Sequence, residues 1–160
     1  MEKDNVMPAD MQELLDAKNY GIYNRDLMRK VFPRIISDIK SYKPRAKAGD
    51  IIPLYFVLLT NMNGQEFLKN GEPNPKYEAC FLSQKDIASM TGIGINKIPL
   101  YAEVLVRNGL LFEVKDVWEG TNRYLHYYPS FCPRITEDGY IVDNNGEKCV
   151  PDYGDISHKL

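Results

Sequence analysis

The chain has 160 residues, of which 44% are apolar, and its formal net charge at neutral pH is −2. This length supports one compact domain with a hydrophobic core. No segment approaches the roughly 18 consecutive apolar residues that cross a bilayer, and the start of the chain, MEKDNVMPAD, has neither a cationic region nor an apolar signal core. We therefore expect a cytoplasmic protein with no membrane-spanning helix.

The cysteines and histidines predict neither a disulfide framework nor a metal centre. Cys80, Cys132 and Cys149 are an odd number of thiols in a chain without a signal sequence, so we expect them to be reduced. A metal site made of Cys132, Cys149, His126 and His158 is the alternative, but the close paired spacings of structural zinc sites are missing. We expect no metal and no other cofactor.

Charge is distributed unevenly along the chain. Residues 25–48 carry eight Lys or Arg and two Asp or Glu, whereas residues 134–160 carry three and six. A concentrated basic patch attracts phosphate even where the net charge of the protein is negative. The alternative for this segment is a solvated helix face, and the two interpretations are equally open on charge alone.

The N-terminal part predicts helices separated by a proline. Residues 1–19 are polar, with one helical candidate in DMQELLDAKN, and we expect them to form an N-terminal extension. From Leu27 to Ile39 the apolar residues recur with helical spacing, and Pro33 predicts a kink or a boundary between two shorter helices. A β-strand in YGIYNR, residues 20–25, is also open.

A third, strongly apolar helix follows in IIPLYFVLL. Asp50 is placed to cap its N-terminus, and Pro53 lies in its first turn, where a missing N–H costs little. Gly and Pro then mark a loop over residues 65–79. CFLS, residues 80–83, predicts a short strand whose last residue, Ser83, caps the next helix.

The stretch from Ser83 to Leu111 has the spacing of a helix-turn-helix. Ala88 is the small residue where the two helices cross, and Gly92 tolerates the positive φ that the turn requires. Ile98 and Tyr101 follow as apolar positions of the second helix that face the first.

Pro99 restricts where that second helix can begin. If Asn96 caps the helix, Pro99 is its third residue and lies in the first turn, where no intrahelical donor is required. A helix that began at Gly94 would lose a backbone hydrogen bond at Pro99, at a cost of about 3 kcal/mol. We therefore expect the later start.

After Leu110 the apolar period shortens to that of a strand, which predicts a β-hairpin with its turn at residues 119–122. Residues 132–160 are polar, acidic and rich in Gly, Asn and Asp. We expect them to form an irregular, partly ordered tail with a small hairpin around NNGE and mobile last residues.

This order of elements resembles the winged helix-turn-helix domains of replication initiators and related DNA-binding proteins from phages and plasmids of Gram-positive bacteria. The resemblance covers about residues 20–131 and rests on YGIYNRDLM, IIPLYFVLL, LSQKDIASMTGIG and LVRNGLL. It implies an α+β winged helix with residues 1–19 as an N-terminal helical extension and residues 132–160 as the tail. It also implies a regulator of replication or transcription whose partner is double-stranded DNA.

In such domains the second helix of the motif enters the major groove, and the hairpin, or wing, follows the backbone or the minor groove. Carried onto this chain, the resemblance assigns Asn96 and Lys97 to base edges, the start of the first helix to phosphates, and the hairpin turn to the wing contact. Arg107 and Lys115 are further phosphate candidates or, alternatively, ordinary solvated charges. The DNA-binding candidates are Ser83, Gln84, Lys85, Asn96, Lys97, Arg107, Lys115, Thr121, Asn122 and Arg123.

Other residues of the second helix favour a different function. Leu100 and Val106 would form an outward apolar pair beside the reading positions, and Glu103 would repel phosphate. The alternative is a protein-interaction module, such as a phage-encoded adaptor or inhibitor that binds a host or replication protein. A homodimer through residues 25–42 is compatible with either function. Because no nucleotide loop, metal motif or nucleophile elbow is present, we expect no enzyme activity.

Overall fold

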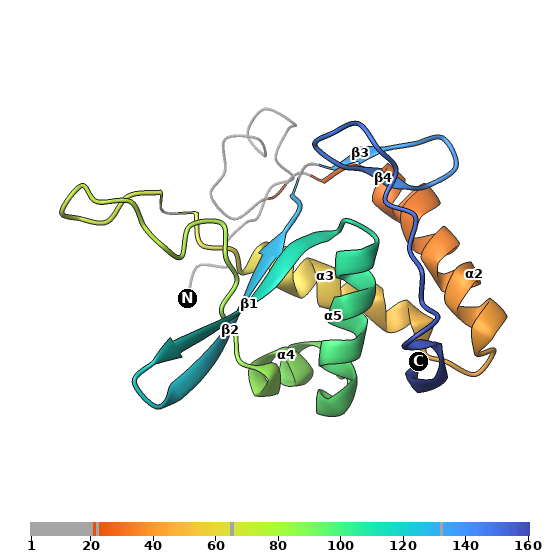
Figure 1. Ribbon diagram of the computed structural model, residues 1–160, viewed down its shortest axis with the longest axis horizontal. Coiled ribbons are helices and arrows are strands. Elements are labelled where there is room, and N and C mark those ends of the chain that lie inside the picture. The colour runs from red at the N-terminus through yellow and green to blue at the C-terminus, as the bar shows by residue number, and fades with distance from the viewer. Residues whose placement is uncertain (1–20, 22, 65, 132) are drawn as a thin grey trace, which may run out of the picture.

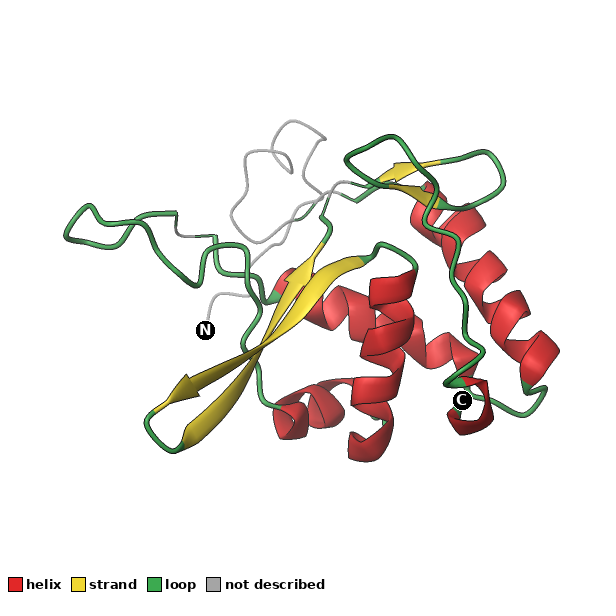
Figure 2. Cartoon of the chain, in the orientation of Figure 1, coloured by secondary structure: helices red, strands yellow, loops and turns green. Residues whose placement is uncertain are grey.

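The computed structural model describes residues 21, 23–64, 66–131 and 133–160, so the predicted helix at residues 10–19 lies outside the described residues. The mixed architecture of helices and short sheets confirms the α+β class (Figures 1 and 2). The main helices are α2 (Phe32–Tyr42), α3 (Ile51–Thr60), α4 (Gln84–Thr91) and α5 (Ile98–Arg107). The strands are β1 (Leu111–Glu119), β2 (Asn122–Pro129), β3 (Arg134–Ile135) and β4 (Ile141–Val142). Single helical turns are η1 (Leu27–Val31), η2 (Ala48–Asp50), η3 (Ile95–Lys97) and η4 (Ser157–Lys159).

Helix α3 lies in the centre of the core, where it contacts α4, α5 and β2. Its buried residues are Ile51, Leu54, Tyr55 and Leu58. The Tyr55 hydroxyl donates a hydrogen bond of 2.6 Å to the carbonyl oxygen of Ser130, which joins this helix to the end of the hairpin. The strongly buried helix that the apolar run predicts is therefore present, and it supports the elements that carry the candidate site.

Pro33 and Pro53 both lie near helix starts, where a backbone donor is not needed. Pro33 is the second residue of α2, at its boundary with the π-helical turn η1, which confirms the predicted boundary. Pro53 lies in the first turn of α3, as predicted. Asp50 precedes α3 but its side chain makes no capping hydrogen bond, because η2 already brings this residue into helical conformation. The prediction of a side-chain cap at Asp50 is wrong.

The α4–turn–α5 unit has the predicted spacing and a different cap. Ser83 caps α4, accepting a hydrogen bond of 3.1 Å from the Asp86 amide, and Gly92 ends the helix at φ +76°. Asn96 does not cap α5, since it lies inside the 3-10 turn η3 and α5 begins at Ile98. Pro99 is therefore the second residue of α5, which confirms the late start.

The hairpin of β1 and β2 turns between Glu119 and Asn122, as predicted. The short strand predicted at CFLS is reduced to one bridge, in which Cys80 and Tyr127 exchange two backbone hydrogen bonds of 2.7 and 2.8 Å. This bridge fixes the segment before α4 beside β2. It thereby sets the position of α4 relative to the hairpin.

The C-terminal residues pack against the core, so the prediction of mobile last residues is wrong. A bridge between Val142 and Lys148 closes the predicted hairpin around NNGE, and β3 pairs with β4 just before it. Beyond it the chain runs between α2 and α5, as the blue segment in Figure 1 shows. Tyr153 and Leu160 are only 1% and 4% exposed, because they bury their side chains in the core cluster.

Candidate nucleic-acid interface

Two cavities lie at opposite ends of α4, and together they contain four of the predicted DNA-binding residues. The first, which we call the hairpin groove, has a volume of about 620 Å³ and separates the start of α4 from β2. The residues that line it are Phe81, Leu82, Ser83, Gln84, Asp86, Arg123, Tyr124 and Leu125. The structure thus brings Arg123 of the hairpin opposite Ser83 and Gln84, as one shared interface requires.

The second, which we call the basic cavity, has a volume of about 320 Å³ and lies where α4 turns into α5. The residues that line it are Arg45, Ala46, Lys47, Asp50, Gly92, Gly94, Lys97, Tyr101 and Leu160. Lys97 is exposed here, and its ammonium group donates a hydrogen bond of 2.6 Å to the carbonyl oxygen of Lys159. Asn96 and Lys85 are also exposed, so the side chains predicted to read bases and phosphates at this helix pair face solvent.

Arg123 projects from the hairpin beside an acidic neighbour. Its guanidinium donates two hydrogen bonds to the Asp116 carboxylate, the longer of which is 3.0 Å. The hydrogen bonds and charge of Arg123 lower the pKa of Asp116 below its ordinary value. Both side chains are more than half exposed, so solvent screens this pair and a phosphate can compete for the guanidinium.

The other hairpin candidates divide between the turn and the opposite face. Thr121 and Asn122 are exposed at the turn. Lys115 pairs with His126 across the hairpin, whereas Arg123 pairs with Trp118, so alternation places Lys115 and Arg123 on opposite faces. Lys115 lies 5.4 Å from the centre of the Tyr128 ring. The structure therefore separates Lys115 from Arg123.

Arg107 differs from the other candidates because three acceptors already surround it. Its guanidinium contacts the Glu103 carboxylate at 2.9 Å, the Asp155 carboxylate at 2.6 Å and the carbonyl oxygen of Asp152 at 2.7 Å. The side chain is only 21% exposed, and these bonds raise the pKa of Arg107 above its ordinary value. In this conformation Arg107 holds the C-terminal segment against α5.

The outer part of α5 is covered, which removes the outward apolar pair expected at Leu100 and Val106. Both side chains are half-buried and pack against the hydrophobic core. Pro99 is the one residue of α5 in the exposed class, so a ligand reaches this helix mainly through η3 and Lys97. The prediction of a free apolar face on α5 is wrong, because both side chains pack against the core.

The basic segment 25–48 is partly used to bind the C-terminal residues. Lys30 pairs with Glu137 at 3.1 Å, and Arg34 donates a hydrogen bond of 2.8 Å to the carbonyl oxygen of Gly139. Arg45 and Lys47 are left at the basic cavity, beside Lys97. Sequence reasoning did not place these two cations at the site, although the opposite charges of residues 25–48 and 134–160 were a signal that the segments attract.

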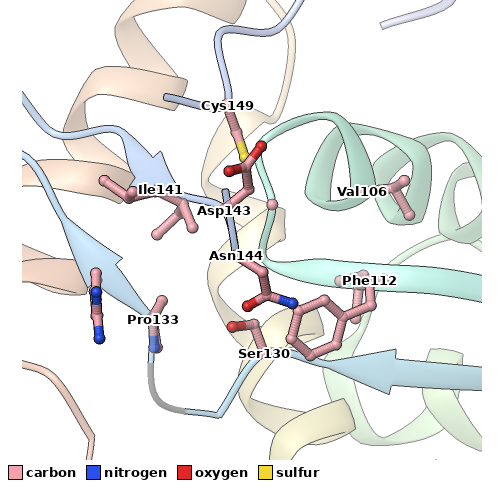
Figure 3. A pocket seen from close by; sticks show the side chains of 12 residues that line it. Val106, Phe112, Ser130, Pro133, Ile141, Asp143, Asn144 and Cys149 are labelled. Carbon is pink, nitrogen blue, oxygen red and sulfur yellow. The ribbon is translucent and has the colours of Figure 1, made fainter. Parts of the chain in front are cut away.

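A third cavity, of about 400 Å³, lies between the end of α5, β1 and the C-terminal hairpin (Figure 3). Cys149 and Asp143 line it together with Ser130, Ile141 and Phe112. Burial raises the pKa of the Cys149 thiol, which makes it a weaker nucleophile at neutral pH. Its mixed lining contains no arrangement that we recognise as catalytic.

Within the described residues, no cluster of three His, Cys, Asp or Glu side chains could hold a metal ion. The helices of the same residues include none that is long and apolar enough to cross a membrane. The chain matches no protein-family model, no curated protein and no solved structure.

Proposed function

We propose that the protein binds double-stranded DNA as a winged helix, with the β1–β2 hairpin as its wing. The observation that carries the proposal is the position of exposed cations at both ends of α4. Arg123 faces the start of the helix across the hairpin groove, and Lys97 lies at the basic cavity beyond its other end. The biological role that fits the resemblance is regulation of phage or plasmid replication or transcription.

Helix α4 separates the cavities at which Arg123 and Lys97 lie. Its eight residues extend about 12 Å, since an α-helix rises about 1.5 Å per residue. The major groove of B-DNA is also about 12 Å wide. In the proposed complex Arg123 and Lys97 contact phosphates, so Lys97 takes a different role from the base contact that the resemblance implies. Asn96, its neighbour in η3, reaches an adenine edge.

The proposed function requires only that the protein occupies a DNA site, and it involves no chemical step. Phosphate contacts would provide most of the affinity, and each neutralised phosphate releases counterions, so binding weakens steeply as the salt concentration rises. The Asn96 amide would add sequence preference through a bidentate contact with adenine. Base contacts are few in this arrangement, because most of α5 is covered.

The test is duplex binding by a charge-reversed variant. Fluorescence anisotropy with a labelled random duplex at low salt measures the affinity of wild type and of Lys97→Glu/Arg123→Glu. We expect the double variant to lose at least tenfold in affinity with nearly unchanged thermal stability, since both side chains are exposed. Lys40→Glu/Lys69→Glu is the matched control, with the same charge change at exposed residues outside both cavities. Equal affinities of wild type and Lys97→Glu/Arg123→Glu would exclude the surface.

A second candidate function is protein binding at the hairpin groove. The groove is lined by Phe81 and Tyr124, which are 45% and 41% exposed, beside Arg123. Exposed aromatic side chains and arginine are enriched where proteins bind each other. Retention of random duplex at low salt favours DNA binding, and its absence favours the protein module. Homodimerisation through residues 25–42 stays a prediction, which sedimentation tests.

A further inference from the structure

We propose that the basic cavity is a binding site for one phosphate group, held by Arg45, Lys47 and Lys97. The cavity joins two segments far apart in the sequence: the connection between α2 and α3, and the turn between α4 and α5. Phosphate is the shared chemistry of two sources, a DNA backbone and a free phosphate ion. The DNA source rests on the proposed function, and the free ion does not.

Arg45 and Lys47 are exposed cations without a side-chain partner among the described residues. This distinguishes them from Arg34 and Arg107, whose guanidinium groups are surrounded by acceptors. The ammonium group of Lys97 donates one of its three N–H groups to the carbonyl oxygen of Lys159, so two remain for a ligand. Among the side chains that line the cavity, three are cationic and one, that of Asp50, is anionic.

The backbone holds the two partnerless cations in place. The Ala46 amide donates to the carbonyl oxygen of Lys43, and the Asp50 amide to that of Lys47, both at 3.0 Å. Ala46 is half-buried and Ala48 is fully buried, so the alternate residues of this connection are anchored in the protein. Arg45 and Lys47 are thereby directed outward from a fixed backbone, which reduces the entropy lost when they bind an anion.

The turn on the other side of the cavity leaves its backbone uncovered. A Cβ atom on Gly92 or on Gly94 would meet no other atom within 4 Å, so neither glycine is required by crowding. Gly92 has φ +76°, which favours glycine, but Gly94 has φ −58°, which any residue adopts. A glycine at position 94 instead permits a ligand to approach the backbone closely.

Asp50 provides a gain-of-function test. Its carboxylate lines the cavity and opposes an anion, and its side chain makes no capping hydrogen bond to α3. Asp50→Asn removes the negative charge with little change in shape, so it should tighten phosphate binding. Arg45→Ala/Lys47→Ala should abolish it. Glu147→Gln and Lys40→Ala/Lys69→Ala are controls for the same charge changes at exposed residues elsewhere.

The first arm of the experiment titrates the full chain with inorganic phosphate at constant ionic strength, followed by amide NMR shifts. We expect saturable shifts at Gly92, Gly94 and Lys97, lost in Arg45→Ala/Lys47→Ala, at least threefold tighter in Asp50→Asn and unchanged in the controls. Shifts that do not saturate, or that persist in the double variant, overturn the proposal whether or not the protein binds DNA.

The second arm distinguishes the source by the salt dependence of duplex binding. If the site holds a backbone phosphate, Arg45→Ala/Lys47→Ala lowers the slope of log K against log salt by about 0.9, the value for one phosphate. Saturable NMR shifts with an unchanged slope, or with no duplex binding, assign the site to free phosphate and leave the proposal intact. If the NMR shifts saturate but the protein binds no duplex, the proposed DNA-binding function is refuted and the phosphate site is not.

Discussion

Asp155 accepts two hydrogen bonds from the guanidinium of Arg107, at 2.6 and 3.0 Å, and so joins the C-terminal segment to the end of α5. The contact links residues 48 positions apart and covers one side of the helix that the DNA proposal concerns. It lowers the pKa of Asp155 to about 2, chiefly through the hydrogen bonds from Arg107.

This ion pair predicts an acid-sensitive attachment of the C-terminal segment. Because the pKa of Asp155 is lower in the folded than in the unfolded protein, its contribution to stability is complete above about pH 4 and is lost as the pH falls towards 2. We expect the melting temperature of wild type to fall further between pH 5 and pH 2 than that of Asp155→Asn. Parallel decreases in calorimetry would contradict the predicted role of the pair.

Replacement of Asn108 should destabilise the protein more than loss of the Asp155 ion pair. Asn108 is fully buried and joins three parts of the fold. Its amide donates to the Tyr153 hydroxyl at 2.7 Å and to the carbonyl oxygen of Val104 at 2.8 Å, and its oxygen accepts from Arg34 at 2.8 Å. Asn108→Ala should lower the free energy of unfolding by about 1–3 kcal/mol, since it leaves buried groups unpaired.

Tyr153→Phe serves as the milder comparison in the same urea unfolding experiment. It removes one hydrogen bond and keeps the buried ring, so we expect a loss of about 1 kcal/mol. A smaller effect for Asn108→Ala than for Tyr153→Phe would show that Asn108 does not connect α2, α5 and the C-terminal segment.

Local signals made much of the fold predictable. Ser83 as a cap, Gly92 in the turn and the hairpin turn after Glu119 each depend on a few neighbouring residues, and all three are present. The position of the C-terminal segment depends on contacts such as Arg34 with Gly139, 105 residues apart, which no local pattern contains. An acidic, Gly-rich composition therefore indicated mobility where long-range pairing gives order.

The candidate site divides in the same way. Lys97 and Asn96 are exposed as the helix-turn-helix spacing predicted, because that spacing determines which side of a helix faces the core. Arg45 and Lys47 come from a connection about 50 residues earlier, so only the packing of α2 and α3 brings them to Lys97. The covering of Arg107 is likewise a tertiary effect.

A single methyl group added at Gly139 should destabilise the protein strongly. It has φ +88°, and an added Cβ would lie 2.7 Å from the carbonyl oxygen of Lys30. Gly146, at φ +80°, has open space around the same position and is the matched control. Gly146→Ala should cost about 1–2 kcal/mol for the left-handed conformation alone. Gly139→Ala should cost about 1–3 kcal/mol more, because the backbone must also move.

If chemical denaturation gave equal losses of unfolding free energy for the two alanine variants, the close packing of Gly139 against η1 would be refuted. The packing matters for the attachment of the C-terminal hairpin, since Arg34 binds the carbonyl oxygen of the same glycine. A Gly139→Ala protein that remains folded should therefore show amide shift changes around both Arg34 and Gly139 in NMR spectra.

Trp118 gives a direct optical test of contact at the hairpin. It is the single tryptophan of the chain and is 62% exposed on β1, on the same face as its cross-strand partner Arg123. An indole this exposed should emit at nearly the wavelength of the unfolded chain. If the hairpin contacts DNA as proposed, addition of duplex should quench or shift this emission with the same affinity as anisotropy reports. The hairpin and the start of α5 belong to one interface if Lys97→Glu/Arg123→Glu weakens this quenching and Lys40→Glu/Lys69→Glu does not. If the emission is unchanged at saturating duplex, the hairpin is not part of the interface.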